Sequence, residues 1–114
     1  MKVTFLGTGT STGVPQLGCK CEVCSSTDSR DKRLRTSALI EVNGKNIIID
    51  CGPDFYVQML RNNQFAKLDA ALITHIHYDH VGGVDDLRPF CSKEGFPFYC
   101  TADVSSDLHK HIPY

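Results

Sequence analysis

Four side chains that can bind a metal ion fall within the six consecutive residues HIHYDH. They are His75, His77, Asp79 and His80. The motif follows an apolar run at residues 68–73 and precedes a pair of glycines, so it lies where a buried strand should end in a tight turn. Alternate side chains of an extended backbone share a face, so His75 and His77 can bind one ion together. Asp79 and His80 follow in the turn, where they can bind a second.

The chemistry of these side chains limits the choice of metal. Imidazole with carboxylate suits zinc, with manganese or iron as competitors. A polar turn with exposed histidines is the alternative, but four potential ligands at this spacing favour a metal site. Asp50, at the end of another apolar run, either caps a turn or accepts a hydrogen bond from one of the histidines and so fixes its ring tautomer.

A second cluster consists of three cysteines within six residues, Cys19, Cys21 and Cys24. Three thiolates can surround one ion, and a tetrahedral structural zinc would need a fourth ligand that the sequence does not assign. The alternatives are a redox pair formed by Cys21 and Cys24, or thiols without a partner. The strand and helix expected around a thioredoxin-like pair are not evident. We therefore expect a structural zinc.

Hydrophobic patterning outlines the elements that must position these residues. Strands are predicted at residues 3–6, 36–42, 46–50, 68–73 and 96–100. Helices are predicted at residues 54–62, from His80 or Val81 to Pro89, and from Ser105 or Ser106 to just before Pro113. Asn43-Gly44 predicts a hairpin between the second and third strands. The third strand is apolar throughout its middle, so both of its faces should be buried.

Two polar segments have open assignments. The glycine- and hydroxyl-rich loop at residues 7–13 is either a phosphate cradle or a plain turn, and it lacks the lysine of a P-loop. Residues 25–35 carry four basic side chains, and form either a solvated loop or a basic lip that attracts a phosphorylated substrate. His109 and His111 are expected to be exposed near a helix end. The isolated cysteines Cys51, Cys91 and Cys100 are predicted to be buried thiols.

Length and composition limit the class of protein. A chain of 114 residues makes one small unit, spanning 1–114, and no internal repeat or linker divides it. Twelve basic residues against 13 acidic ones leave a net charge of -1, so a nucleic-acid partner is not expected. The sequence has no apolar run of transmembrane length and no signal peptide pattern, so we expect a cytoplasmic protein without a membrane partner.

Four motifs together resemble one family of enzymes. HIHYDH has the form H-x-H-x-D-H and resembles the signature of the metallo-β-lactamase superfamily of metal-dependent hydrolases. GTGTSTGVP, GCKCEVC and DCGPD resemble the opening loop, the cysteine cluster and the D-x-G motif of the branch related to PhnP-type phosphoribosyl cyclic phosphodiesterases. The resemblance implies that a distant histidine completes the structural zinc site and that Asp50 supports the metal loop.

The resemblance covers nearly the whole chain but only the N-terminal half of a superfamily domain. It implies an α/β (α+β) fold, half of an αβ/βα sandwich, with a mixed sheet and helices on one face. The second half normally supplies a further His, a bridging Asp and a last His, and none of these can be matched here. We therefore expect a fragment that needs its C-terminal half or self-association.

The resemblance also implies an activity for the complete enzyme: hydrolysis of a small, cyclic phosphodiester at two divalent metals, zinc or manganese. Asp79 would assist proton transfer besides binding metal. Ribonuclease Z-type RNA processing and thiolester or lactone hydrolysis are the alternatives within the superfamily. The alternative of another class is an inactive metal-binding module. The fragment alone is expected to be inactive because half of the ligands are missing.

Overall fold

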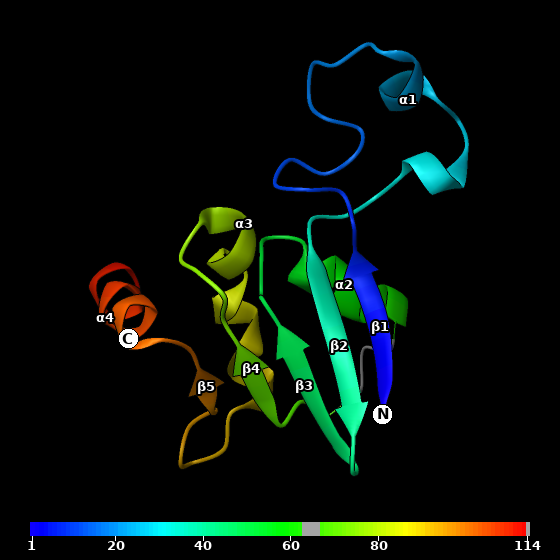
Figure 1. The fold of residues 1–114 in the computed structure, drawn as a ribbon. Helices are drawn as coiled ribbons and strands as arrows, with labels where there is room; N and C mark the ends of the chain where they lie inside the picture. The colour runs from blue at the N-terminus through cyan, green and yellow to red at the C-terminus, as the bar shows by residue number, and fades with distance from the viewer. Residues whose placement is uncertain (63–66, 114) are drawn as a thin grey trace.

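The computed structural model describes residues 1–62 and 67–113 and is built on one five-stranded mixed sheet (Figure 1). The strands are β1 (Lys2–Gly7), β2 (Ser37–Val42), β3 (Lys45–Ile49), β4 (Ala70–Leu72) and β5 (Phe98–Tyr99), adjacent in chain order. β1, β2 and β3 pair antiparallel, and β3, β4 and β5 pair parallel. The predicted mixed sheet is therefore confirmed.

Helices lie between these strands along the chain, and one follows the last strand. They are α1 (Glu22–Ser25), α2 (Phe55–Asn62), α3 (Tyr78–Val81) and α4 (Ala102–His111), with the 3-10 helices η1 (Ser29–Asp31) and η2 (Val84–Phe90). α2 carries the crossover between the parallel strands β3 and β4, as expected for a parallel connection. Among the described residues, none of the helices has the length and apolar character that crossing a membrane requires.

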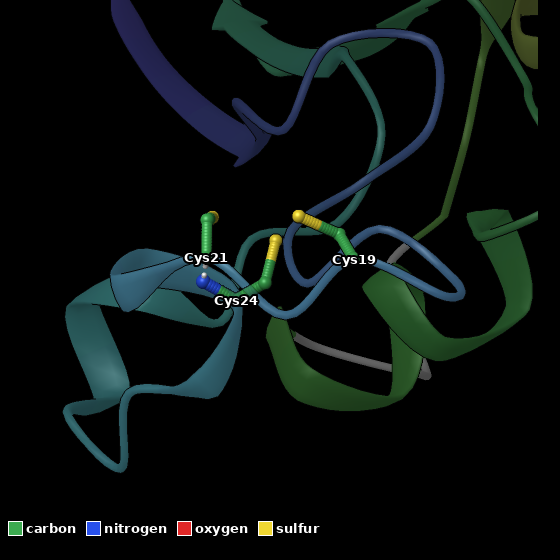
Figure 2. A group of neighbouring side chains, drawn as sticks. All are labelled: Cys19, Cys21 and Cys24. Carbon is green, nitrogen blue, oxygen red and sulfur yellow. Dashed lines mark hydrogen bonds between the residues drawn. The ribbon is translucent and has the colours of Figure 1, made fainter.

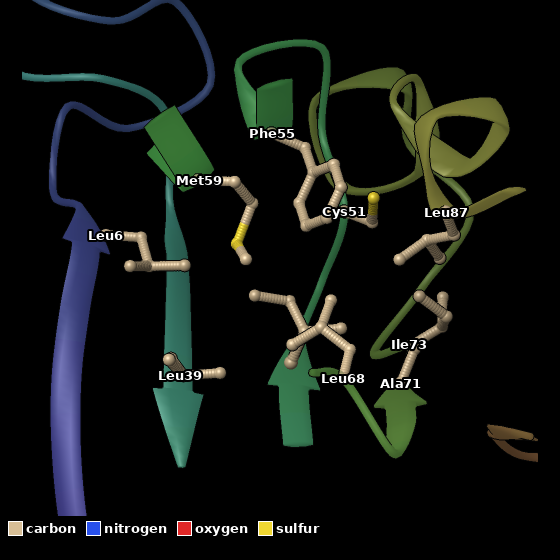
Figure 3. Packing of buried hydrophobic residues seen from close by; sticks show 10 residues of the cluster. Leu6, Leu39, Cys51, Phe55, Met59, Leu68, Ala71, Ile73 and Leu87 are labelled. Carbon is tan, nitrogen blue, oxygen red and sulfur yellow. The ribbon is translucent and has the colours of Figure 1, made fainter. Parts of the chain in front are cut away.

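The core lies between one face of the sheet and the helices α2 and η2 (Figure 3). Phe55 and Met59 of α2 and Leu87 of η2 pack over Leu39, Ile48 and Ala71. Burying each large apolar side chain completely contributes about 1.5–3 kcal/mol, so this layer holds the sheet edge that carries the site. Val104 and Leu108 of α4 pack against the same cluster, so α2, η2 and α4 lie on one face of the sheet, as predicted.

The prediction that both faces of the third strand are buried is wrong. Ile48 is fully buried under α2, whereas Ile47 and Ile49 on the other face are only half-buried. The physical reason is that no described helix or loop crosses that second face, which lies open toward the viewer in Figure 1. An apolar composition indicates that both faces can be buried, but not what covers them.

Helix boundaries after the HIHYDH motif also differ from the prediction. One helix was expected up to Pro89, but α3 and η2 are separated at Gly82 and Gly83, and η2 includes Pro89. Gly83 donates its N–H to the Cys51 carbonyl at 2.9 Å, a tertiary contact that interrupts the helix. α4 begins at Ala102, after Thr101, one turn before the serines expected to cap it.

The three isolated cysteines do not share one environment. Cys51 is fully buried, as predicted, and burial followed by the charges of Asp86 and Asp50 raises the pKa of its thiol well above the usual value. Cys91 and Cys100 are exposed, so the prediction for them is wrong. Each directly follows the end of an element, η2 or β5, where the chain has left the core.

Candidate metal centre

The HIHYDH motif lies at the carboxyl end of β4, beside the carboxyl end of β3. Ile49 and Leu72 are in register in this parallel pair, and the Asp50 N–H donates to the Leu72 carbonyl at 2.9 Å. Parallel neighbours end at the same edge of a sheet, so the residues that follow both strands meet there. This topology brings Asp50 next to Thr74 and the histidines, although 24 residues separate Asp50 from Thr74.

The structure brings the three histidine rings together. The ring centroids of His75 and His77 are 4.7 Å apart, and those of His75 and His80 are 3.9 Å apart. Asp79 Oδ2 lies 3.1 Å from His80 Nε2, and both side chains are 15% exposed. His75 therefore lies beside His77, its expected partner at one ion, and also beside His80, which was expected to bind a second ion. Three imidazoles and one carboxylate lie close together and none of the four residues is fully buried, so their chemistry suits a divalent metal. Their roles as ligands stay a prediction.

Asp50 is the buried hydrogen-bond hub behind these rings. Its carboxylate accepts from the Thr74 N–H at 2.8 Å, the Thr74 hydroxyl at 2.8 Å and His80 Nδ1 at 2.7 Å. A carboxylate only accepts, so His80 Nδ1 donates its proton to Asp50. In the neutral ring, Nε2, which faces Asp79, is then the nitrogen that could bind a metal ion held between the two side chains. The contact between Asp50 and His80 matches the role of tautomer-fixing acceptor rather than that of a simple turn cap.

Thr74 extends the same effect to His75, and sequence reasoning assigned it no role. Its hydroxyl proton is donated to Asp50, so the hydroxyl oxygen accepts from His75 Nδ1, 2.9 Å away. His75 Nε2 is then the nitrogen with a free lone pair. One buried carboxylate thus orients two of the three rings, one directly and one through a hydroxyl. A hydroxyl residue directly before the first histidine was the available signal.

The metal loop is held against the segment that follows Asp50. Cys51 donates its N–H to the His80 carbonyl at 2.7 Å and accepts from the Gly83 N–H at 2.9 Å. Gly52 packs directly against the Asp79 carbonyl, where a Cβ would overlap with backbone. The position of Asp79 and His80 therefore depends on a residue without a side chain at position 52.

An ion pair links the same segment to the glycine-rich loop. Asp54, at the start of α2, accepts from the Arg35 backbone N–H at 2.8 Å and from Arg35 Nη1 at 2.7 Å. Arg35 Nε donates to the Ser11 carbonyl at 3.0 Å. Arg30, Lys32 and Arg33 likewise donate to protein groups within residues 26–32. These contacts favour the solvated loop over the basic lip, because the four basic side chains are bonded to neighbouring protein groups.

The cysteine trio forms a compact group on the excursion between β1 and β2 (Figure 2). The Sγ atoms of Cys19, Cys21 and Cys24 all lie within 4.8 Å of one another, and the thiols are free. Over residues 1–62 and 67–113 no other trio of His, Cys, Asp or Glu is that compact, so the ligand atoms of the histidine motif are more spread out.

Local hydrogen bonds shift the pKa values of two thiols of the trio. The Cys24 N–H donates to Cys21 Sγ at 3.5 Å, and this bond, followed by contacts from the Cys19 and Cys24 thiols, lowers the pKa of Cys21 to about 7. The Gln16 N–H lowers the pKa of Cys24, but the Cys19 thiol, desolvation and the Cys21 thiol together raise this pKa by more, so the net shift is upward. Three soft thiols at this spacing fit a structural zinc with one ligand from elsewhere.

His109 and His111 lie outside both clusters. They are exposed on the last turn of α4, and each contacts a carbonyl one turn earlier through Nδ1, at 2.8 Å in both cases. The expectation of exposed histidines near a helix end is confirmed. Neither residue completes a metal site in the described structure.

Comparison with known proteins places the chain in a family. Residues 45–114 match the family model described as the beta-lactamase superfamily domain. The chain is 49% identical over 118 residues to an octanoyltransferase from Porphyromonas gingivalis. The matched region covers 100% of this chain but only 23% of that protein. Most of that protein lies outside the matched region, so its name is not assigned to this chain.

Two solved structures are similar over nearly the whole chain. One is a diphosphatase from the PhnP family, with a TM-score of 0.90 and 43% identity, matching 98% of this chain and 46% of that one. The other is zinc-bound PqqB from Methylobacterium extorquens, with a TM-score of 0.81 and 27% identity, matching 96% and 40%. The chain thus spans less than half the length of these relatives. With its sheet, its motif and its family match in agreement, the chain belongs to the metallo-β-lactamase superfamily of metal-dependent hydrolases.

Proposed function

We propose that the chain supplies the N-terminal half of a metal-dependent phosphodiesterase centre. The observation that carries the proposal is the network in which Asp50 fixes the ring tautomers of His80 and, through Thr74, of His75. Such outer contacts are typical of metal-binding histidines and add little to a turn of exposed imidazoles. The relatives that share this half include a zinc-bound protein, which supports divalent metal use.

Each side chain has a defined task in this proposal. His75 and His77 hold one divalent ion, and Asp79 with His80 holds another, either zinc or manganese. When bound, such ions supply Lewis acidity and lower the pKa of water in the site. Asp79 accepts a proton at its carboxylate during the reaction. Asp50 keeps His80 oriented, and Cys19, Cys21 and Cys24 hold a structural zinc apart from the reaction.

The substrate class is a small phosphodiester, most simply a cyclic one. The support is the 43% identity to a diphosphatase of the PhnP family, which indicates chemistry at phosphorus rather than at a thiolester or lactone. That relative also makes diphosphate hydrolysis the second candidate. Ribonuclease Z-type activity is less favoured, because the basic residues 30–35 are engaged with protein groups and the net charge is -1.

A chimera tests the proposal, since the chain spans 46% of the length of the PhnP-family diphosphatase. Residues 1–113 would replace the matching half of the PhnP-family diphosphatase, and metal content and hydrolysis of bis-p-nitrophenyl phosphate and of a diphosphate would be measured. We expect hydrolysis that His77→Ala abolishes and that the matched surface substitution His109→Ala leaves unchanged.

The outcomes separate the candidates. A chimera that melts cooperatively, binds metal at the histidine motif and hydrolyses neither substrate would instead support a metal-binding module. Cleavage of the diphosphate alone would establish the second candidate. Full activity of the His77→Ala chimera would contradict the assignment of the site.

A further inference from the structure

Ser37, the first residue of β2, carries a buried hydroxyl on the core side of the sheet. The residue is 3% exposed and shares a face of the strand with Leu39, which packs in the core. Its backbone is paired with Gly7 of β1, and the next residue, Ala38, is paired with Ile49 of β3. The hydroxyl therefore lies on a rigid element between two neighbouring strands.

The Ser37 hydroxyl bonds to the backbone at the point where β3 ends. Its Oγ lies 2.9 Å from the Asp50 carbonyl oxygen and 3.1 Å from the Ile49 carbonyl oxygen, so these two acceptors share its single proton. The paired residues of β2 and β3 end at Ile49, and the hydroxyl extends the contact between the strands by one residue. Ser37 thus holds the backbone of the residue whose carboxylate bonds to His80.

The backbone of Asp50 has an unusual conformation at this position. Its φ of 58° is left-handed, which is unfavourable for a residue with a side chain, although aspartate tolerates it better than most. In this conformation the carboxylate reaches the Thr74 hydroxyl at 2.8 Å and His80 Nδ1 at 2.7 Å. A return to extended backbone would turn the Asp50 carbonyl away from Ser37 and the carboxylate away from His80.

We propose that Ser37 is a positioning residue of the metal centre, which holds Asp50 in the left-handed conformation and thereby orients the ring of His80. Asp50 is then held at both ends, by Ser37 at its carbonyl and by Thr74 and His80 at its carboxylate. Ser37 acts through Asp50 and binds no metal itself. The inference rests on the proposed function for its importance to metal binding, but its effect on His80 is present in the metal-free chain as well.

NMR of the metal-free 114-residue chain at one fixed pH tests the proposal through the Nδ1–H proton of His80. A proton donated to a buried carboxylate over 2.7 Å should give a downfield signal that exchanges slowly with water. Ser37→Ala should broaden or remove this signal. It should also weaken manganese binding, measured by electron paramagnetic resonance, about three- to tenfold, which corresponds to the net effect of one hydrogen bond.

Two other substitutions at the same position separate positioning from stability. Ser37→Thr retains the hydroxyl, so the His80 signal and the manganese affinity should stay close to the wild-type values even if the added methyl group lowers the melting temperature. Ser37→Cys has a weaker donor and should give an intermediate His80 signal, which provides a second test if Ser37→Ala fails to fold. A full wild-type signal in Ser37→Ala, or in Ser37→Cys where Ser37→Ala does not fold, would overturn the proposal.

Gln58→Met is the matched control. Gln58 is also buried, at 1% exposure, and its Nε2 donates to the Arg35 carbonyl at 2.7 Å, so the substitution removes a buried hydrogen bond that does not involve Asp50. It should lower the melting temperature and leave the His80 signal unchanged, and an equal loss of that signal would overturn the proposal. If the wild-type chain binds no manganese, the proposed function fails, whereas the His80 signal still decides the role of Ser37.

Discussion

Asp50→Asn should weaken metal binding by changing the ring tautomer of His80. The carboxylate of Asp50 accepts three hydrogen bonds: the Thr74 N–H at Oδ1, and the Thr74 hydroxyl and His80 Nδ1 at Oδ2. Asp50 has a positive φ of 58°, a left-handed conformation that asparagine adopts as readily as aspartate. The two side chains also have the same shape. An asparagine offers one acceptor oxygen in place of two, so one position must become a donor.

Either orientation of the amide has a cost. With its nitrogen at the Oδ2 position, it would donate to His80 Nδ1, so the ring proton moves to Nε2 and that lone pair is lost to a metal. With its nitrogen at the Oδ1 position, it faces the Thr74 N–H, which leaves a buried donor unsatisfied at about 1–3 kcal/mol. Loss of such an outer contact typically lowers metal affinity 10- to 100-fold, or about 1.4–2.7 kcal/mol.

Manganese binding measured by electron paramagnetic resonance is the suitable assay. Manganese prefers oxygen and nitrogen ligands, so the soft thiols of the cysteine trio do not compete for it. The ring tautomer of His80 is read independently from its 15N chemical shifts. Asp85→Asn is the matched control, because Asp85 lies on the surface in an ion pair with Arg88, and its side chain is 48% exposed. Wild-type manganese affinity in Asp50→Asn, with an unchanged His80 tautomer, would refute the reasoning.

Three further substitutions test the surroundings of the site. Arg35→Lys keeps the charge but removes the planar guanidinium, which bonds to the Asp54 carboxylate and to the Ser11 carbonyl of the glycine-rich loop at the same time. The free energy of unfolding, measured by urea denaturation, should fall by about 1 kcal/mol, and an unchanged value would contradict a structural role. Gly52→Ala places a Cβ against the backbone of the metal loop, so the unfolding free energy should fall by about 3 kcal/mol, and a neutral result would show that the loop can move. The pKa of Asp69 is lowered to about 2, first by the Asn46 N–H and then by Lys67 and Lys45. Because this pKa is lower in the folded state than in the unfolded state, the ionised Asp69 stabilises the fold above the unfolded-state pKa, and that stabilisation is lost as the pH falls toward the folded-state pKa. Asp69→Asn should therefore flatten the decline in melting temperature between about pH 4 and pH 2. Parallel curves of melting temperature against pH for the two proteins would contradict this.

The local parts of the fold followed from the sequence because local chemistry determines them. Asn43 and Gly44 both adopt positive φ, 49° and 71°, which is the conformation that the predicted hairpin turn requires. The helix after Pro53 and the strand before the histidines also lie close to the predicted residues. The ligand-bearing motif was visible for the same reason, since its four side chains are close in sequence.

Features that depend on distant segments could not be predicted in this way. Thr74 takes its role from a carboxylate 24 residues earlier, and Arg35 from an aspartate 19 residues later. The apolar flanks of Cys91 and Cys100 suggested burial, but both residues follow the end of an element at the surface. Likewise, the pattern of the third strand could not show that one of its faces has no cover among the described residues.

We expect the histidine motif to bind metal separately from the cysteine trio. Anomalous diffraction at the zinc edge, from crystals of the 114-residue chain grown with zinc, measures this directly. We expect one peak among Cys19, Cys21 and Cys24 and at least one more beside His75, His77, Asp79 and His80. Zinc at the cysteine trio alone, with an empty histidine motif at saturating zinc, would contradict the account.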